Sequence, residues 1–381
     1  MTPPSTALVS FLSRDWAGLA LAAVAAAVAA ALPGDPTLAG RAIGVAATLM
    51  AIGSITHLIR RRAVLRRHPA PGSLVDVGGY RMHVLAEGDP RGRAAVVWLP
   101  GGHAGAFALH HLHRAIRDEA RSILIDRPGS GWSDTGPFPC TTAREAAEVV
   151  TALQRGGERG PFVLVGHSFG GLLAANIARR RPDLVSGLVL LDATPPDALV
   201  YGPRQAGLRS MPRMATWTGL LRLFGLGRRQ RRQGSDTGRA SDRISRIIDE
   251  RLGEAGIALR AVEGASVGNC FANASIFREL SPQGMAASGW DAATYDGDLV
   301  DLPVWIVAPG DVAEVQSALP EAVSGPEADR QRVLRVMART RERYMATSTR
   351  ARRVVTPAGT GHNFPYESPE SVIAVVREAL G

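Results

Sequence analysis

The stretch Gly166-His167-Ser168-Phe169-Gly170-Gly171 decides the fold, because an apolar segment gives way there to a helix-like one. Residues 161–165 before it are apolar, and residues 172–179 after it are typical of a helix. A serine on such a strand-turn-helix junction is held in a strained backbone conformation. Gly166 and Gly170 lack Cβ atoms and would let strand and helix approach closely behind it. The pattern predicts a serine hydroxyl presented at the carboxyl end of a strand.

A second Gly-x-Ser-x-Gly pattern, at residues 264–268, shows that the five-residue pattern alone is weak evidence. Its serine, Ser266, follows residues 254–263, whose alanines and leucines suit a helix rather than a strand. We therefore interpret Ser266 as structural and Ser168 as the candidate nucleophile.

The composition limits the possible chemistry. With 381 residues, 45% of them hydrophobic, the chain is long enough for one large α/β domain plus an appendage. All 44 basic residues are arginine, so a Schiff-base lysine and a phosphate-loop lysine are both excluded. Cys140 and Cys270 have no metal-binding spacing, and we interpret them as unpaired small apolar residues. The sequence implies no cofactor, no metal and no nucleic-acid partner, and it leaves the oligomeric state open.

The first sixty residues contain two apolar runs with almost no charge, at residues 16–33 and 42–59. Each is just long enough to cross a bilayer, which needs roughly 17 to 25 residues. We expect two transmembrane helices there, which with a basic linker form an anchor over residues 1–68. A cleavable signal peptide is the alternative for the first run, favoured by Ala29-Ala30-Ala31 and opposed by the second run.

The arginines around these runs predict their orientation. One arginine, Arg14, precedes the first run, and Arg41 lies between the two. Because positively charged loops remain in the cytoplasm, both termini are expected there. The sequence thus predicts a multi-pass protein of the cell membrane with a cytoplasmic catalytic portion. The decisive cluster follows the second run and consists of Arg60, Arg61, Arg62, Arg66 and Arg67.

The rest of the chain alternates between strand-like and helix-like segments. Residues 73–85 alternate apolar and polar side chains around Gly78-Gly79, which predicts a hairpin that enters a sheet. Helical stretches such as residues 142–153 separate most of the later apolar runs, an arrangement typical of a mostly parallel, doubly wound sheet. The short apolar runs that predict its strands are residues 94–99, 122–125, 162–165, 187–191, 304–308 and 353–355.

Residues 195–300 lack this alternation and are too long for an ordinary crossover, so we expect a helical cap over the carboxyl edge of the sheet. Residues 203–251 hold twelve arginines and four acids, a local balance of +8. This segment is either a solvated face or a contact with anionic lipid headgroups. For the apolar residues 214–226, ordinary cap core is favoured over a helix that dips into the membrane.

From Gly72 to the C-terminus, apart from the cap, the chain resembles the α/β-hydrolase superfamily. The serine turn is one of four motifs that carry the resemblance. The resemblance implies an α/β-hydrolase fold over residues 69–381 with a cap inserted at about 195–300. The second motif, Leu99-Pro100-Gly101-Gly102-His103, is similar to the family's oxyanion loop, with Pro100 replacing a histidine. The third, residues 126–133, is similar to the family's Asp-Arg-Pro-Gly turn. The fourth, Gly361-His362-Asn363 before Ser368-Pro369-Glu370, is similar to the family's histidine loop.

A serine hydroxyl is a poor nucleophile until a base accepts its proton. His362 is the candidate base, in a glycine-rich loop that matches the family order Ser, acid, His. The usual family position of the acid favours Asp311, which follows the strand-like residues 302–308, and Asp192 is the alternative. The oxyanion hole is expected to use the backbone N–H groups of Phe169 and Gly102.

The predicted function is that of a membrane-anchored serine hydrolase that cleaves a carboxylic ester through an acyl-enzyme, with a lipophilic ester as one option. The expected partners are a small-molecule ester and membrane lipid. Proline iminopeptidase-like, haloperoxidase-like and carbon–carbon bond hydrolase activities would use the same residue types and remain alternatives. A non-catalytic binding protein on this fold is the alternative from another class.

Overall fold

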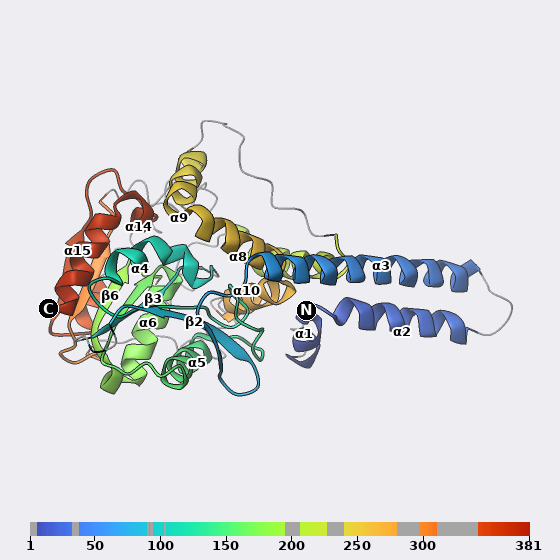
Figure 1. The fold of residues 1–381 in the computed structure, drawn as a ribbon, viewed down its shortest axis with the longest axis horizontal. Coiled ribbons are helices and arrows are strands. Elements are labelled where there is room, and N and C mark those ends of the chain that lie inside the picture. Colours follow the sequence, from blue (N-terminus) through green and yellow to red (C-terminus); the bar gives the residue numbers. More distant parts are fainter. Residues whose placement is uncertain are drawn as a thin grey trace.

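The computed structural model describes residues 6–32, 38–89, 91, 94–102, 104–194, 206–226, 240–279, 297–310 and 342–381. Its centre is an eight-stranded sheet of order β1-β2-β4-β3-β5-β6-β7-β8 (Figure 1). The pairs β1/β2 and β2/β4 are antiparallel and all other neighbours are parallel, which confirms the predicted mostly parallel sheet. The strands are β1 (Ser73–Asp76), β2 (Arg81–Glu87), β3 (Ala95–Leu99), β4 (Ser122–Ile125), β5 (Phe162–His167), β6 (Val185–Leu191), β7 (Val304–Ala308) and β8 (Ala351–Val355).

Helices cover both faces of this sheet, so its central strands are apolar on both sides. In β3 every residue is buried, and successive side chains join opposite cores. Val97 and Leu99 pack in the cluster that contains α5 (Thr142–Arg155) and α6 (Phe169–Arg180). Val96 and Trp98 pack with α4 (His110–Ile116) and α15 (Pro369–Leu380). Short helices η1 (Ala106–Leu109), η2 (Pro182–Leu184) and α14 (Phe364–Glu367) join these elements.

The turn between β5 and α6 has the tight packing that its glycines imply. A Cβ added at Gly170 would lie 1.9 Å from the carbonyl oxygen of Leu99. One added at Gly166 would lie 2.3 Å from the carbonyl oxygen of Gly170. Only hydrogen fits at these two positions, so strand and helix meet directly behind the serine.

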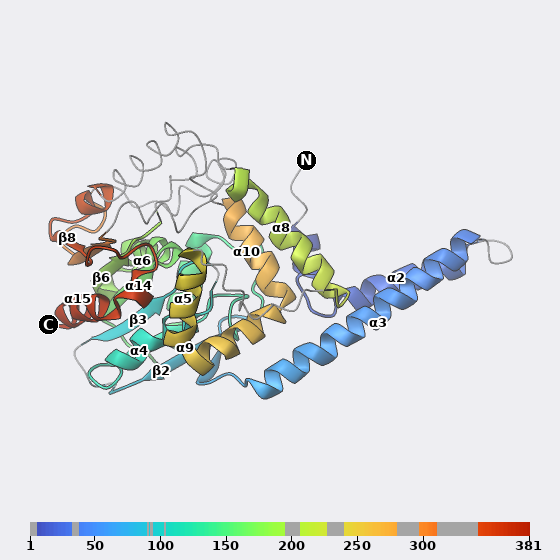
Figure 2. The same cartoon turned by 90° about the horizontal axis from the view of Figure 1, so that it is seen from above.

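Three helices lie between β6 and β7 in the sequence: α8 (Ala206–Leu223), α9 (Ala240–Gly264) and α10 (Val267–Glu279). We call them the inserted helices. Figure 2 shows α10 between α8 and the main body. Leu259 and Val262 of α9 belong to the same buried cluster as Phe107, which fastens α9 to the body. The apolar stretch 214–226 is divided, since Leu223 is buried whereas Trp217 is exposed.

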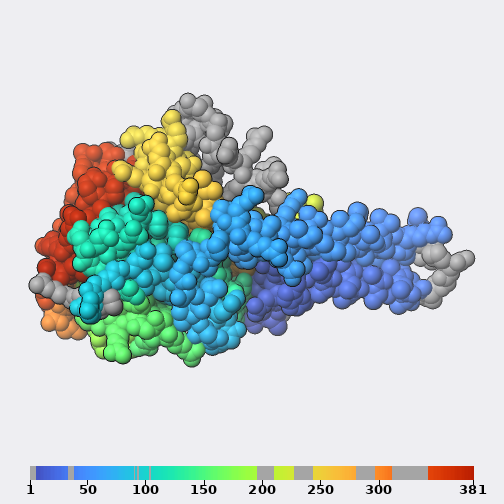
Figure 3. Space-filling model, viewed as in Figure 1, coloured from blue at the N-terminus to red at the C-terminus, as the bar shows by residue number. Residues whose placement is uncertain are grey.

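The N-terminal segment forms α1 (Thr6–Leu12), α2 (Ala17–Ala31) and α3 (Leu38–Arg67). Helices α2 and α3 lie side by side as a hairpin that projects from the body (Figures 1 and 3). Within the described residues, α3 alone is long and apolar enough to cross a membrane; α1 and α2 qualify only as a pair bent by 101°. The two predicted spans are therefore not confirmed. The first run yields a helix of 15 residues, Ala17–Ala31, which meets the length of a span only when it is counted together with α1.

Polar contacts and close packing fasten the base of the hairpin to the inserted helices. Ser54 Oγ donates a hydrogen bond to the carbonyl oxygen of Leu223 at 2.8 Å. A Cβ added at Gly53 would lie 2.1 Å from the carbonyl oxygen of Phe224. Asp15, just before α2, pairs with His57 at 3.0 Å and accepts a hydrogen bond from the Val267 N–H at 3.1 Å. The N-terminal helices and the inserted helices therefore form one packed unit.

Candidate active site

Ser168 lies on the sharp turn between β5 and α6, with φ 52° and ψ −120°. This left-handed backbone conformation is costly for a residue with a side chain, so the surroundings must hold it. The Ser168 N–H donates to the Leu191 carbonyl at 3.0 Å, and the Ser168 carbonyl accepts from the Thr194 N–H at 2.9 Å. Ser168 Oγ lies 3.2 Å from Thr194 Oγ1. The loop after β6 thus braces the predicted nucleophile.

The predicted base contacts an acid from the same edge of the sheet. His362 follows β8, and its Nδ1 lies 2.7 Å from Oδ2 of Asp192, directly after β6. Asp192 has φ 41°, a second strained residue at this edge. The contact belongs to the alternative acid of the sequence analysis. The favoured acid, Asp311, lies outside the described residues, so its role stays a prediction.

The pair Ser168 and His362 forms no direct hydrogen bond in the described part of the chain, where Ser168 Oγ bonds to Thr194. Catalytic hydrogen bonds in ligand-free enzymes are often long and tighten only with substrate. The bond between nucleophile and base is therefore expected to form when substrate binds.

His167, which precedes the serine, positions the loop of His362. Its Nε2 lies 2.9 Å from the carbonyl oxygen of His362, and the two rings are 4.8 Å apart. Burial, together with the nearby His362, lowers the pKa of His167 to about 3, so its ring is neutral and can donate this hydrogen bond. Sequence alone does not indicate this role of His167, because its position in the Gly-x-Ser-x-Gly pattern tolerates any residue type.

The predicted oxyanion donors lie on two segments that adjoin the serine. Phe169 is the first residue of α6 and directly follows Ser168. Gly102 follows β3 with φ 53°, and a Cβ added at its neighbour Gly101 would lie 2.9 Å from Ser168 Cβ. The loop after β3 is thus in contact with the serine turn, as an oxyanion hole requires.

Arg127 joins these two segments. It is 2% exposed, and its Nη2 donates a hydrogen bond to the carbonyl oxygen of Gly102. Its guanidinium carbon lies 4.9 Å from the ring centroid of Phe169, a cation–π contact. Glu145 Oε2 lies 3.5 Å from Nη1 and balances the buried charge. The sequence analysis used the Asp-Arg-Pro-Gly turn only as a sign of the fold and missed this contact.

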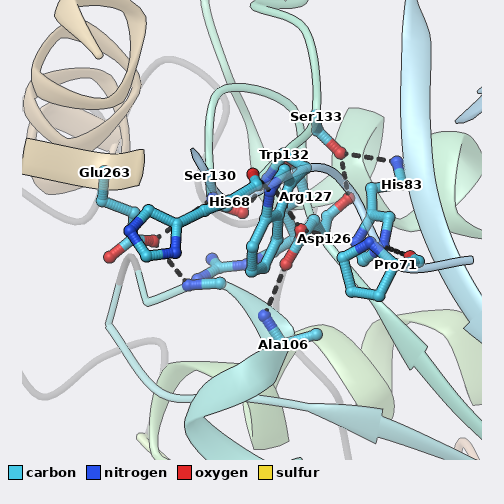
Figure 4. Close-up of polar contacts among 12 residues, drawn as sticks. His68, Pro71, His83, Ala106, Asp126, Arg127, Ser130, Trp132, Ser133 and Glu263 are labelled. Carbon is cyan, nitrogen blue, oxygen red and sulfur yellow. Dashed lines mark hydrogen bonds and ion pairs between the residues drawn. The ribbon is translucent and has the colours of Figure 1, made fainter. Parts of the chain in front are cut away.

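Two buried carboxylates hold the far end of the loop that follows β3. Asp126 Oδ1 accepts a hydrogen bond from the Ala106 N–H at 2.6 Å, and its Oδ2 accepts from the Trp132 N–H at 2.9 Å. Glu263 reaches in from α9, and its Oε1 accepts from the Gly105 N–H at 2.7 Å (Figure 4). An inserted helix therefore contacts the same loop that carries Gly102.

Glu263→Gln should change how the stability of the protein depends on pH. Burial raises the pKa of the Glu263 carboxyl from 4.5 to about 7, so the fold favours the protonated form. Between pH 4.5 and about pH 7, the Glu263 carboxyl has lost its proton in the unfolded chain but keeps it in the native chain. The free energy of unfolding should therefore fall as pH rises, by up to about 3 kcal/mol, and become level above pH 7.

The glutamine retains the Oε1 acceptor for Gly105 but cannot ionise. Chemical unfolding of both proteins between pH 4.5 and 8 measures the difference, and the variant should lack this component of the slope. Parallel pH profiles would show that Glu263 does not titrate in this range.

The model of the alpha/beta hydrolase family matches residues 96–375, which is more than half of the chain. The chain belongs to the alpha/beta hydrolase family.

Its relatives include lipases and esterases. Lipase LipV of Mycobacterium tuberculosis is 36% identical over 113 residues, 29% of this chain and 41% of that protein. An esterase of the same organism is 36% identical over 104 residues, 26% of this chain and 33% of that protein. The matched stretches thus span less than half of these curated relatives. A thermophilic esterase from Thermogutta terrifontis shares the fold, with a TM-score of 0.51 and 21% identity over 81% of this chain and 96% of that one. Family and relatives identify the chain as a hydrolase.

Proposed function

We propose that the protein is a serine hydrolase that cleaves a carboxylic ester, with Ser168 as nucleophile, His362 as base and Asp192 as the orienting acid. The 2.7 Å contact between His362 Nδ1 and Asp192 Oδ2, beside a serine on a strained turn, carries this proposal. An acid at Nδ1 leaves Nε2 unprotonated and free to accept a proton. Asp192 is preferred to Asp311 because its contact with the base is observed.

In the proposed reaction Ser168 Oγ attacks the ester carbonyl while His362 Nε2 accepts the hydroxyl proton. The new C–O bond converts the carbonyl into a tetrahedral oxyanion. The N–H groups of Phe169 and Gly102 would donate to this oxygen, and Arg127 would hold the two segments that carry them.

The same histidine would complete both halves of the reaction. His362 gives its proton to the departing alcohol oxygen, which leaves the acyl group bonded to Ser168. A water molecule, deprotonated by His362, then attacks this acyl-enzyme. The bond between the acyl carbon and Ser168 Oγ breaks, His362 returns the proton to Ser168 Oγ, and the carboxylic acid leaves. Asp192 stabilises the imidazolium form each time, because its carboxylate is 4% exposed and lies directly at Nδ1.

Purified full-length protein should hydrolyse p-nitrophenyl esters, and a series of graded acyl lengths tests both the reaction and the substrate. An ester activity agrees with the lipase and esterase names of the relatives. We propose a lipophilic acyl group, since the apolar hairpin would hold the enzyme near lipid. Labelling by a fluorophosphonate probe without hydrolysis of any ester in the series would point to one of the other chemistries of this fold.

We also propose that the α2–α3 hairpin anchors the protein in the cell membrane and that the remaining residues, 69–381, form a cytoplasmic hydrolase domain capped by the inserted helices. The hairpin carries exposed apolar side chains along its length, among them Leu49 and Ile52. Both of its ends lie beside the body (Figure 1), so α1 and the hydrolase domain share one side of the membrane.

The five arginines of residues 60–67 predict which side this is, because their transfer across the bilayer during insertion is disfavoured. Alkaline phosphatase fused after Gly381 should be inactive, whereas a reporter that needs the cytoplasm should be active at the same position. The reverse pair of results would place the hydrolase domain outside the cytoplasm.

A further inference from the structure

One face of α8 is apolar and open to solvent. Met214, Trp217 and Leu221 are 62%, 65% and 44% exposed, and their spacing of three and four residues places them on one side of the helix. The opposite side is packed: Leu223 is buried, and a Cβ added at Gly219 would lie 2.8 Å from the ring of Phe271 in α10. The exposed stripe, which we call the α8 face, is therefore not a loosely packed part of the core.

The α8 face lies on the side of the molecule from which the hairpin projects. Figure 2 shows α8 as the outer layer on that side, with α10 behind it. A second tryptophan, Trp16, lies at the start of α2 and is 52% exposed. Exposed arginines lie near both tryptophans in the sequence, Arg14 two residues before Trp16 and Arg213 four residues before Trp217. Tryptophan and arginine together are typical of the level where hydrocarbon meets lipid headgroups.

The length of the hairpin indicates how close this surface must come to the bilayer. The base is held by the contacts of Gly53 and Ser54 with the end of α8. The part of α3 before that contact, residues 38–53, is about 24 Å long at 1.5 Å per residue. The hydrocarbon core is about 30 Å thick, and the headgroup regions add roughly 5 to 7 Å on each side. At about 24 Å this part of α3 is shorter than the hydrocarbon core, so the hairpin comes near the far side only if its base lies at the near boundary of that core.

We infer that the α8 face is a membrane-docking surface whose occupant is the lipid bilayer, with Met214, Trp217 and Leu221 inserted at the headgroup level. The surface is continuous with the hairpin, since Leu223 and Phe224 at the end of α8 contact α3. Docking removes the apolar stripe from water, which is favourable because apolar surface is buried. The inserted helices then rest on the bilayer, so that a lipophilic ester, if the proposed function holds, enters from the lipid.

A depth measurement on the full-length protein tests this inference. Met214→Cys and Leu221→Cys, each labelled with the environment-sensitive NBD fluorophore, are reconstituted into vesicles of phosphatidylcholine and phosphatidylglycerol. The natural cysteines, Cys140 and Cys270, are both buried, and unmodified protein supplies the labelling blank. Ala374→Cys is the matched control, because Ala374 is exposed on α15 at the end of the molecule opposite the hairpin.

Both α8 labels should shift their emission to shorter wavelength and lose most of their intensity when lipids with a spin label near the headgroup are included. The label at residue 374 should do neither. Water-like, unquenched emission from both α8 labels while the protein sediments with the vesicles would overturn the inference, as would equal quenching at residue 374. The readout does not depend on hydrolysis, so failure of the proposed activity and failure of membrane docking are distinguishable.

Discussion

Replacement of Ser168 by alanine is expected to lower the kcat for ester hydrolysis by on the order of a million-fold and to abolish labelling by a fluorophosphonate probe. The reason is chemical, since alanine offers no oxygen to form the acyl-enzyme. Alanine keeps a Cβ in the same strained turn, so the packing of Gly166 and Gly170 behind it is unchanged. Stopped assays with a p-nitrophenyl ester and gel-based probe labelling measure the two losses.

Ser266→Ala is the matched control, because it removes a serine from the same five-residue pattern. Ser266 precedes α10, where its Oγ accepts a hydrogen bond from the Asn269 N–H at 3.2 Å, as an N-cap residue does. Loss of this N-cap hydrogen bond should lower the free energy of unfolding by about 1 kcal/mol and leave labelling by the fluorophosphonate probe intact. Retained labelling of the Ser168 variant would place the nucleophile elsewhere.

Asp192→Asn should reduce kcat by about four orders of magnitude while the protein remains folded. An asparagine can donate its amide N–H to His362 Nδ1, which would place the proton on Nε2 and prevent that atom from accepting the serine proton. The pH profile of kcat should also change, because the carboxylate that stabilises the imidazolium is gone. Steady-state kinetics with a p-nitrophenyl ester give both quantities.

Asp311→Asn is the comparison that separates the two acids of the sequence analysis. We expect it to have a much smaller effect, since His362 Nδ1 already bonds to Asp192. If the Asp311 variant lost more activity than the Asp192 variant, the orienting role would belong to Asp311, and the roles of Ser168 and His362 would be unaffected.

The strands could be predicted because the strands of a buried parallel sheet are continuous apolar runs in the sequence. A central strand covered on both faces must be apolar throughout, and β3, β4 and β7 are continuous apolar runs at the predicted positions. Strand β5 continues to His167, beyond the predicted 162–165, because its last two residues belong to the glycine-rich turn. Such ends depend on pairing partners that composition does not reveal.

The acid could not be chosen from sequence for a related reason. Asp192 and Asp311 follow β6 and β7, which are neighbours in the sheet, so both chain positions lead to the same edge. Only the course of each loop decides which carboxylate meets His362. The contact of Glu263 with Gly105 could not be predicted, because the two residues are 158 positions apart and a local sequence pattern does not indicate contacts between distant segments.

The anchor shows a similar limit. Apolar composition indicates that residues 16–33 and 42–59 avoid water, but not where each helix starts and stops. The helix of the first run begins at Ala17, after the bend between Leu12 and Ala17, and Asp15 within that bend is fixed by His57 and the Val267 N–H. These partners come from distant segments, so the break is a tertiary effect rather than a property of the run.

The packed base of the hairpin has a practical consequence for handling this protein. Val9 and Ala17 share a buried cluster with Leu223 and Phe271, so residues before the hydrolase domain supply part of its interior. Arg61 likewise donates a hydrogen bond from Nη1 to the Val262 carbonyl at 3.0 Å. A shortened version cut after residue 68 would expose that interior and aggregate. Preparations that keep residues 1–68 are therefore the right material for crystallisation and for inhibitor screening.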